Sequence, residues 1–119
     1  MVFQDGAYAN LALPKLLATS RLPDRDRAFT QELAFGSIRN RGLYEAIVEH
    51  AAKRSISELD EEVIWVLLIG CHQLLELRVP NHAAISETVN LAKANLRKSV
   101  VGLVNGVLRR VSEKNRGLW

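Results

Sequence analysis

Residues 61–78 read EEVIWVLLIGCHQLLELR, and this stretch decides the fold. After the two glutamates almost every position is apolar, so a helix formed here would be apolar on nearly all sides. Asp60 is a candidate N-cap, and Glu61 and Glu62 fall in the first turn, where carboxylates interact favourably with the helix dipole. A helix that is apolar all round needs neighbours on every side, so we expect it at the centre of the molecule.

Helical periodicity recurs on both sides of this stretch. Hairpin signals are missing, because neither Asp5-Gly6 nor Asn105-Gly106 lies between two alternating runs. We therefore expect an all-α bundle with further helices at residues 7–19, 24–40, 43–53, 83–95 and 99–114. The side chains expected to face the core are Leu11, Leu13, Leu16 and Leu17 in the first of these helices, Phe29, Leu33, Phe35 and Ile38 on several sides of the second, Ile47 and Ala51 in the third, and Ile85, Val89, Ala92 and Leu96 in the fourth.

The composition is that of one ordinary globular domain. The chain has 119 residues, of which 48% are apolar and 24% charged, enough for a real core and unlike a disordered protein. Cys71 is the only cysteine, so no disulfide within the chain is possible, as expected in a reducing compartment. The apolar run at 63–71 is shorter than the about 20 residues of a membrane span, and MVFQDGAY does not resemble a signal peptide. We expect a cytoplasmic protein without membrane contact.

The charges are unevenly distributed along the chain. The net charge is +3, but residues 45–62 hold six acids and two bases, a sum of −4. Residues 93–119 hold seven bases and one acid, a sum of +6. A field of one sign over the last quarter of the chain favours an anionic partner there. The alternative is a solvated helix face that only keeps the protein soluble.

The sequence contains no pattern that supports catalysis. The glycines form no phosphate-binding loop, and the three histidines lack metal-ligand spacing. Cys71 and His72 are adjacent, so they project about 100° apart on a helix and do not form a nucleophile–base pair. We expect Cys71 to be an inert core residue and His72 to be a partly buried, hydrogen-bonded one.

The helix expected at 99–114 has two faces when it is placed at about 100° per residue. Valines and leucines repeat at i, i+4, i+7, i+8 and i+11 from Val100, and Gly102, Asn105 and Arg109 lie opposite them. Glycine inside a helix costs about 1 kcal/mol relative to alanine, so two glycines there indicate that something comes close on that side. Asn105 either bonds a neighbouring helix, with Glu87 as our expected partner, or lies beneath a nucleic-acid backbone. We favour the helix contact.

Three segments together resemble a known family. They are DRAFTQELAFGSIRNRG (26–42), LDEEVIWVLLIGCHQLLELRVPNHAAISETVNLAK (59–93) and VGLVNGVLRRV (101–111). Their order and spacing resemble the NusB-like RNA-binding domain, in the version that precedes the catalytic domain of bacterial 16S ribosomal-RNA cytosine-C5 methyltransferases of the Sun/Fmu/RsmB type. The resemblance implies two packed three-helix bundles. This chain departs from the family in one respect, because we expect the family's first basic helix to be missing or truncated before Asp5. The resemblance also implies that residues 1–119 are a single domain and a fragment of a longer chain.

The resemblance implies an accessory function. Such a domain holds ribosomal RNA while a separate methyltransferase domain in cis transfers a methyl group from S-adenosylmethionine. In that family the nucleophile lies in Pro-Cys and Thr-Cys motifs, whereas Cys71 stands in Gly-Cys-His, so we expect this chain alone to be no enzyme and to bind no cofactor. Two alternatives stay open. One is a stand-alone antitermination factor with a ribosomal-protein partner, and the other is a helical dimerisation module that packs through Gly102 and Gly106.

Basic residues at the end of the second expected helix and along the last one are our candidates for RNA contact. Guanidinium groups and ammonium groups neutralise phosphates, and the guanidinium fork matches two phosphate oxygens. The alternative for each residue is an ordinary surface position or a structural ion pair. The candidates are Arg39, Arg41, Lys98, Arg109, Arg110 and Arg116.

Overall fold

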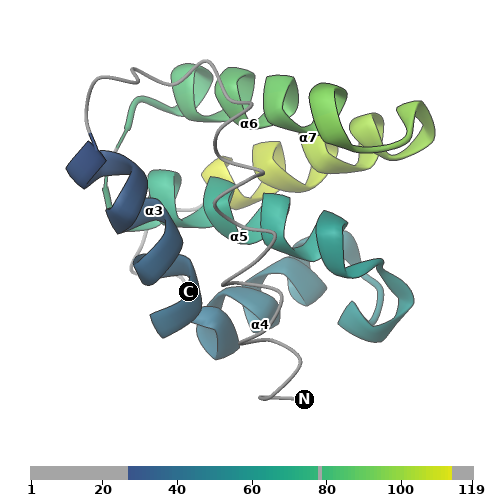
Figure 1. Ribbon diagram of the computed structural model, residues 1–119. Coiled ribbons are helices and arrows are strands. Elements are labelled where there is room, and N and C mark those ends of the chain that lie inside the picture. The colour runs from purple at the N-terminus through teal and green to yellow at the C-terminus, as the bar shows by residue number, and fades with distance from the viewer. Residues whose placement is uncertain (1–26, 78, 114–119) are drawn as a thin grey trace.

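The computed structural model describes residues 27–77 and 79–113 (Figure 1). Within these ranges the chain forms helices and no strand, which confirms the predicted all-α class. The helix expected at 7–19, the start of the helix expected at 24 and the candidate Arg116 lie outside the described residues. The elements are α3 (Arg27–Arg39), α4 (Arg41–Ala52), the 3-10 helix η1 (Ile56–Glu58), α5 (Glu61–Leu75), α6 (Asn81–Asn95) and α7 (Lys98–Glu113).

Helix α5 is the central element, as its sequence predicts. Every residue from 63 to 75 is buried, and α5 contacts α3 and α4 as well as α6 and α7 (Figure 1). Gly70 allows α7 to come close, because a Cβ atom on Gly70 would lie 2.7 Å from a methyl carbon of Leu108. Within the described residues, α5 therefore belongs both to the group formed with α3 and α4 and to the group formed with α6 and α7.

The two ends of α5 differ in detail from the helix that the sequence predicts. Asp60 occupies the N-cap position, but its side chain makes no capping hydrogen bond; its carboxylate instead accepts from the Arg97 guanidinium at 3.4 Å. At the other end the amide of Leu77 donates to the carbonyl of His72, five residues back, and the regular helical ladder stops. The helix therefore ends at Leu75 rather than at residue 78.

The packing of α6 differs from the predicted stripe of Ile85, Val89, Ala92 and Leu96. The buried residues are Ala84, Thr88, Leu91 and Ala92. The buried polar pair explains part of the difference, because Gln73 of α5 donates to the Thr88 hydroxyl at 3.1 Å and Thr88 donates to the Ala84 carbonyl at 2.7 Å. With that face against α5, the side chains of Ile85 and Val89 are left half-buried.

The inward faces of α4 and α7 agree with the sequence, whereas that of α3 does not. Ile47 and Ala51 of α4 are buried, and so is the valine and leucine stripe of α7 from residue 104 to residue 111. In α3 Leu33 is buried, but Phe35 is 59% exposed and Ile38 is 40% exposed. The expectation that α3 is buried on several sides is therefore wrong for Phe35 and Ile38.

None of the helices in the described ranges combines the length and the apolar character that crossing a membrane would require.

Candidate functional site

Arg109 and Arg110 are neighbours in the sequence but lie on different faces of α7. Adjacent residues on a helix project about 100° apart. Arg110 donates from Nη1 to the carbonyl oxygen of Ala51 at 2.9 Å, in the last turn of α4. A cation near the carboxyl end of a helix interacts favourably with the helix dipole and with a carbonyl that lacks an intrahelical partner. Arg110 therefore ties α7 to α4, whereas Arg109 faces α6.

Arg41 is held inside the fold. Its side chain is 17% exposed and forms ion pairs with Glu45 and, at 3.2 Å, with Glu61. The guanidinium carbon also lies 5.0 Å from the ring centroid of Trp65, a cation–π geometry. Glu61 accepts from the Trp65 indole at 3.1 Å as well. The structure thus places Arg41 in a structural ion pair, which was the alternative to RNA contact for this residue.

Arg39 ends α3 and remains largely exposed. Its side chain is 60% exposed and lies 3.4 Å from the Glu32 carboxylate, a distance typical of a weak surface ion pair. It is not among the residues that line the hollows beside Lys98 and Arg109. The five candidates that the structure describes therefore do not form one patch.

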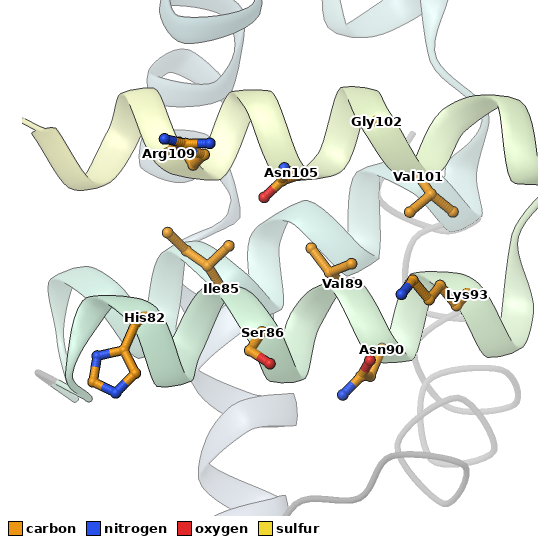
Figure 2. Close-up of a pocket in the computed structure, with 10 residues that line it drawn as sticks. All are labelled: His82, Ile85, Ser86, Val89, Asn90, Lys93, Val101, Gly102, Asn105 and Arg109. Carbon is orange, nitrogen blue, oxygen red and sulfur yellow. The ribbon is translucent and has the colours of Figure 1, made fainter.

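A groove lies between α6 and α7, and we name it the α6/α7 groove (Figure 2). Its volume is about 560 Å³. A smaller hollow beside it is lined by Leu96 and Lys98 and shares Lys93, Val101 and Gly102 with the groove. The residues that line the α6/α7 groove are His82, Ile85, Ser86, Val89, Asn90, Lys93, Val101, Gly102, Asn105 and Arg109.

The groove has an apolar floor and a polar rim. Figure 2 shows Ile85 and Val89 of α6 pointing toward α7, with Val101 pointing back toward α6. His82, Ser86 and Asn90 line the outer edge of α6. None of the described residues in the lining is acidic, and Lys93 and Arg109 bring two positive charges. An anionic ligand with an apolar part suits this arrangement.

Sequence reasoning placed Arg109, Asn105 and Gly102 on one face but missed the α6 side of the groove. Ile85 and Val89 repeat at i and i+4, which is also the spacing of a core stripe, so the sequence alone assigned them to the core. Lys93 belongs to the basic block at 93–119 and could have been found by placing that block on the helices. No sequence signal distinguishes a stripe that faces the core from one that lines a groove.

The expected bond between Asn105 and Glu87 is absent from the described part of the chain. Asn105 lines the groove with Ile85 and Val89, whereas Glu87 is not part of the lining. On α6, Glu87 and Val89 project about 160° apart, so Glu87 points away from this edge. The structure also does not bring another described element close to Gly102 or Gly106, where an added Cβ would meet nothing within 4 Å.

A second polar cluster is buried where α3, α4 and α5 meet. His72 is fully buried and joins the Tyr44 hydroxyl at Nδ1, 2.7 Å away, to the Glu32 carboxylate at Nε2, 2.8 Å away. Because a carboxylate only accepts, Nε2–H is the donor to Glu32. This hydrogen bond holds the pKa of Glu32 below its ordinary value of 4.5. We name these three residues the His72 chain.

The thiol of Cys71 lies in an environment that makes it unreactive. Cys71 is fully buried, and burial raises the pKa of its thiol to about 12, which makes it the unreactive core residue expected. The described histidines, cysteine and carboxylates do not gather into a group that could hold a metal ion. What the described residues offer is a binding groove.

Comparison with known proteins identifies the relatives. A protein of Mycobacterium tuberculosis named as a methyltransferase is 43% identical over 113 residues, which is 95% of this chain and 25% of that protein. The ribosomal RNA small subunit methyltransferase B of Citrobacter koseri is 34% identical over 98% of this chain and 27% of its own length. The protein of that name from Salmonella enteritidis is 35% identical over 99% of this chain and 27% of its own length.

The chain thus spans about a quarter of the length of the curated relatives it matches. No solved structure gave a significant match to it. The family model for the NusB family matches residues 2–113, almost the whole sequence, and the all-α architecture described above fits that family. The chain belongs to the NusB family.

Proposed function

We propose that this chain is the RNA-binding accessory domain of a longer ribosomal-RNA cytosine-C5 methyltransferase that works in the cytoplasm. One observation carries the proposal: this NusB family domain corresponds to about a quarter of relatives whose names call them methyltransferases. In such a protein the remaining part contains the methyltransferase domain, in cis, and binds S-adenosylmethionine. The present chain contributes the RNA contact.

The α6/α7 groove supports the RNA contact. Lys93 and Arg109 line it, Lys98 lines the adjoining hollow, and no acidic residue among the described ones interrupts this surface. Neither Lys98 nor Arg109 is engaged in an ion pair with another described residue. Of the candidates predicted from the sequence, we therefore keep Lys98 and Arg109 as the first RNA contacts, with Arg39 as a further exposed one. Arg41 and Arg110 have structural partners, and Arg116 remains a proposal from sequence alone.

A titration with a small-subunit ribosomal RNA fragment at increasing salt tests this function. Binding through phosphates weakens linearly in log K against log salt, by about 0.9 per contacted phosphate on a duplex and about 0.7 on a single strand. The double substitution Lys98→Glu with Arg109→Glu should weaken binding at least about tenfold. The double substitution Lys53→Glu with Arg54→Glu changes the net charge by the same amount and is the matched control, because both residues are exposed but line neither hollow. No binding at low salt, or binding without a salt slope, would overturn the proposal.

The reading frame that encodes the chain provides a second test. Our proposal requires that it continues into a methyltransferase domain with a cofactor-binding motif and a Pro-Cys motif. A stop codon close behind the codon for Trp119 would instead favour the stand-alone antitermination factor with a ribosomal-protein partner.

A further inference from the structure

A small apolar patch is exposed where α3 meets α4 (Figure 1). Phe35 and Ile38 are three positions apart on α3, so they share one face of that helix. Only Asn40 separates α3 from α4, and Leu43 lies in the first turn of α4. In the described ranges, these three are the large apolar side chains that stand exposed. We name Phe35, Ile38 and Leu43 the α3/α4 patch.

The core does not use the side chains of this patch. Leu33 of α3 and Tyr44 of α4 are buried and pack into the core, while Phe35 and Leu43 are each more than half exposed. Single apolar side chains are common on protein surfaces, but adjacent ones indicate contact with another surface. Arg39 lies beside them and is largely exposed, so the patch has a polar rim, as protein interfaces do.

The area of the patch limits the kind of contact that it can make. Its exposed side chains present on the order of 300 Å² of apolar surface. A stable complex of two separate proteins buries about 800 Å² on each partner. A contact centred on this patch is therefore too small to hold a second copy of the chain or a separate protein firmly. A partner tethered to the same chain needs less area, because the tether gives it a high effective concentration.

The lengths of the relatives point to such a tethered partner. About three quarters of each of them lies outside the part that this chain matches. In the proposed function that remainder contains the methyltransferase domain. The patch residues line neither the α6/α7 groove nor the hollow beside it, so a domain that covers the patch leaves those surfaces free for RNA.

We propose that the α3/α4 patch docks against the methyltransferase domain of the same chain. The inference rests on the proposed function and deepens it, because it names the surface that joins the two domains. The docking surface on the partner domain is apolar opposite Phe35, Ile38 and Leu43, and polar or acidic opposite Arg39. Such a contact fixes the position of the catalytic domain relative to the RNA-binding groove, which a flexible linker alone would not do.

Hydroxyl-radical footprinting tests the inference on two proteins, the 119-residue chain and the full-length protein that its reading frame encodes. In the 119-residue chain Leu43 should react as an exposed leucine. In the full-length protein we expect Leu43 to lose most of this reactivity and to approach Leu33, a leucine that is fully buried. Leu103, half-buried on α7, is the control and should react equally in both proteins.

The double substitution Phe35→Gln with Leu43→Gln tests the contact energetically. In the full-length protein it should lower the unfolding temperature of this domain by about 5 °C, because it removes apolar area that the contact buries. In the 119-residue chain both side chains are exposed, and the shift should be less than about 2 °C. Lys53→Gln with Arg54→Gln is the control in both proteins, because these exposed residues lie outside the patch.

The outcomes separate the docking inference from the proposed function. If Leu43 reacts equally in both proteins, or if the double substitution leaves the full-length protein unchanged, the docking inference is wrong while the proposed function stands. Equal destabilisation of both proteins would show that this chain itself covers the patch, and protection that grows with the concentration of the 119-residue chain would show a second copy there. Either result overturns the inference. A reading frame without a methyltransferase domain would contradict the proposed function itself.

Discussion

The His72 chain and the α6/α7 groove are two polar regions of one small helical domain, and they differ in where their partners lie. In the His72 chain each end of a fully buried imidazole meets a polar side chain of another helix. In the groove the polar side chains of Asn90, Asn105 and Lys93 meet no described partner. The polar groups of the His72 chain find their hydrogen-bond partners within the protein, whereas those of the α6/α7 groove remain available to a ligand.

The glycines near these regions show the same difference. Gly36 lies so close to the His72 ring that a Cβ atom would be 2.1 Å from Nε2. Gly102, on the edge of the groove, faces open space. A glycine that the fold needs is thus distinguished from one that the fold tolerates, and substitution of each glycine tests the distinction directly.

The largest effect is expected for Gly36→Ala. The added methyl group would overlap the His72 ring, which is fully buried and cannot move without losing its hydrogen bonds to Tyr44 and Glu32. We expect the free energy of unfolding to fall by about 3 kcal/mol. Gly42→Ala is the matched control, since its Cβ meets nothing within 4 Å and the stability should stay equal or rise by at most about 1 kcal/mol. Urea denaturation measures both, and equal stabilities would contradict the described packing.

The next effect concerns the hydroxyl group of Tyr44. Tyr44→Phe keeps the buried ring but leaves the buried Nδ1 of His72 without the hydroxyl at 2.7 Å. An unsatisfied buried polar atom costs about 1–3 kcal/mol, and we expect a loss of about 2 kcal/mol in the free energy of unfolding. RNA affinity of the folded variant should be unchanged, because Tyr44 does not line the groove. A change of less than about 0.5 kcal/mol would show that the hydrogen bond is not formed in solution.

Arg109 and Arg110 allow a residue that lines the groove to be compared with an adjacent residue that has its partner inside the fold. Arg110→Gln removes the donor to the Ala51 carbonyl and should cost about 1 kcal/mol of stability with little change in the salt slope of RNA binding. Arg109→Gln should change stability by less than about 0.5 kcal/mol but lower the salt slope. Thermal unfolding measures the stability of each variant, and the RNA titration measures its salt slope. If Arg109→Gln lowered the stability and Arg110→Gln lowered the salt slope, the roles assigned to the two arginines would be wrong.

The smallest effect is a pH dependence that involves Glu32. The hydrogen bond from His72 lowers the pKa of the folded Glu32 carboxyl below 4.5, so its ionised form contributes stability above about pH 4.5 that is lost as the pH falls through the folded value. Glu32→Gln should therefore be less stable than the native chain at neutral pH, and this gap should narrow in acid. The Glu32 side chain is 40% exposed, so we expect a modest gap. Thermal unfolding at about pH 7 and about pH 3 measures it, and a constant gap would exclude the linkage.

The sequence predicted the fold class and the order of the helices well, and the reason lies in α5. Apolar residues on every side of one helix leave a central position as the stable solution, and residues 63–75 are all buried. The two faces of α7 were also readable, because they depend only on the helical period. The α3 prediction failed at Phe35 and Ile38, since apolar residues on several sides do not reveal which sides receive a neighbour.

What the sequence determined by itself is therefore the local and periodic part: helices, a central α5, an inert Cys71 and a basic last quarter. Only the tertiary structure decided which polar groups find partners. Arg110 reaches a carbonyl 59 positions away, His72 joins Tyr44 and Glu32 from two other helices, and Ile85 and Val89 line a groove instead of the core. Helical periodicity fixes the direction of a side chain around its own axis. What that side chain meets depends on how distant helices pack, and no local pattern contains that information.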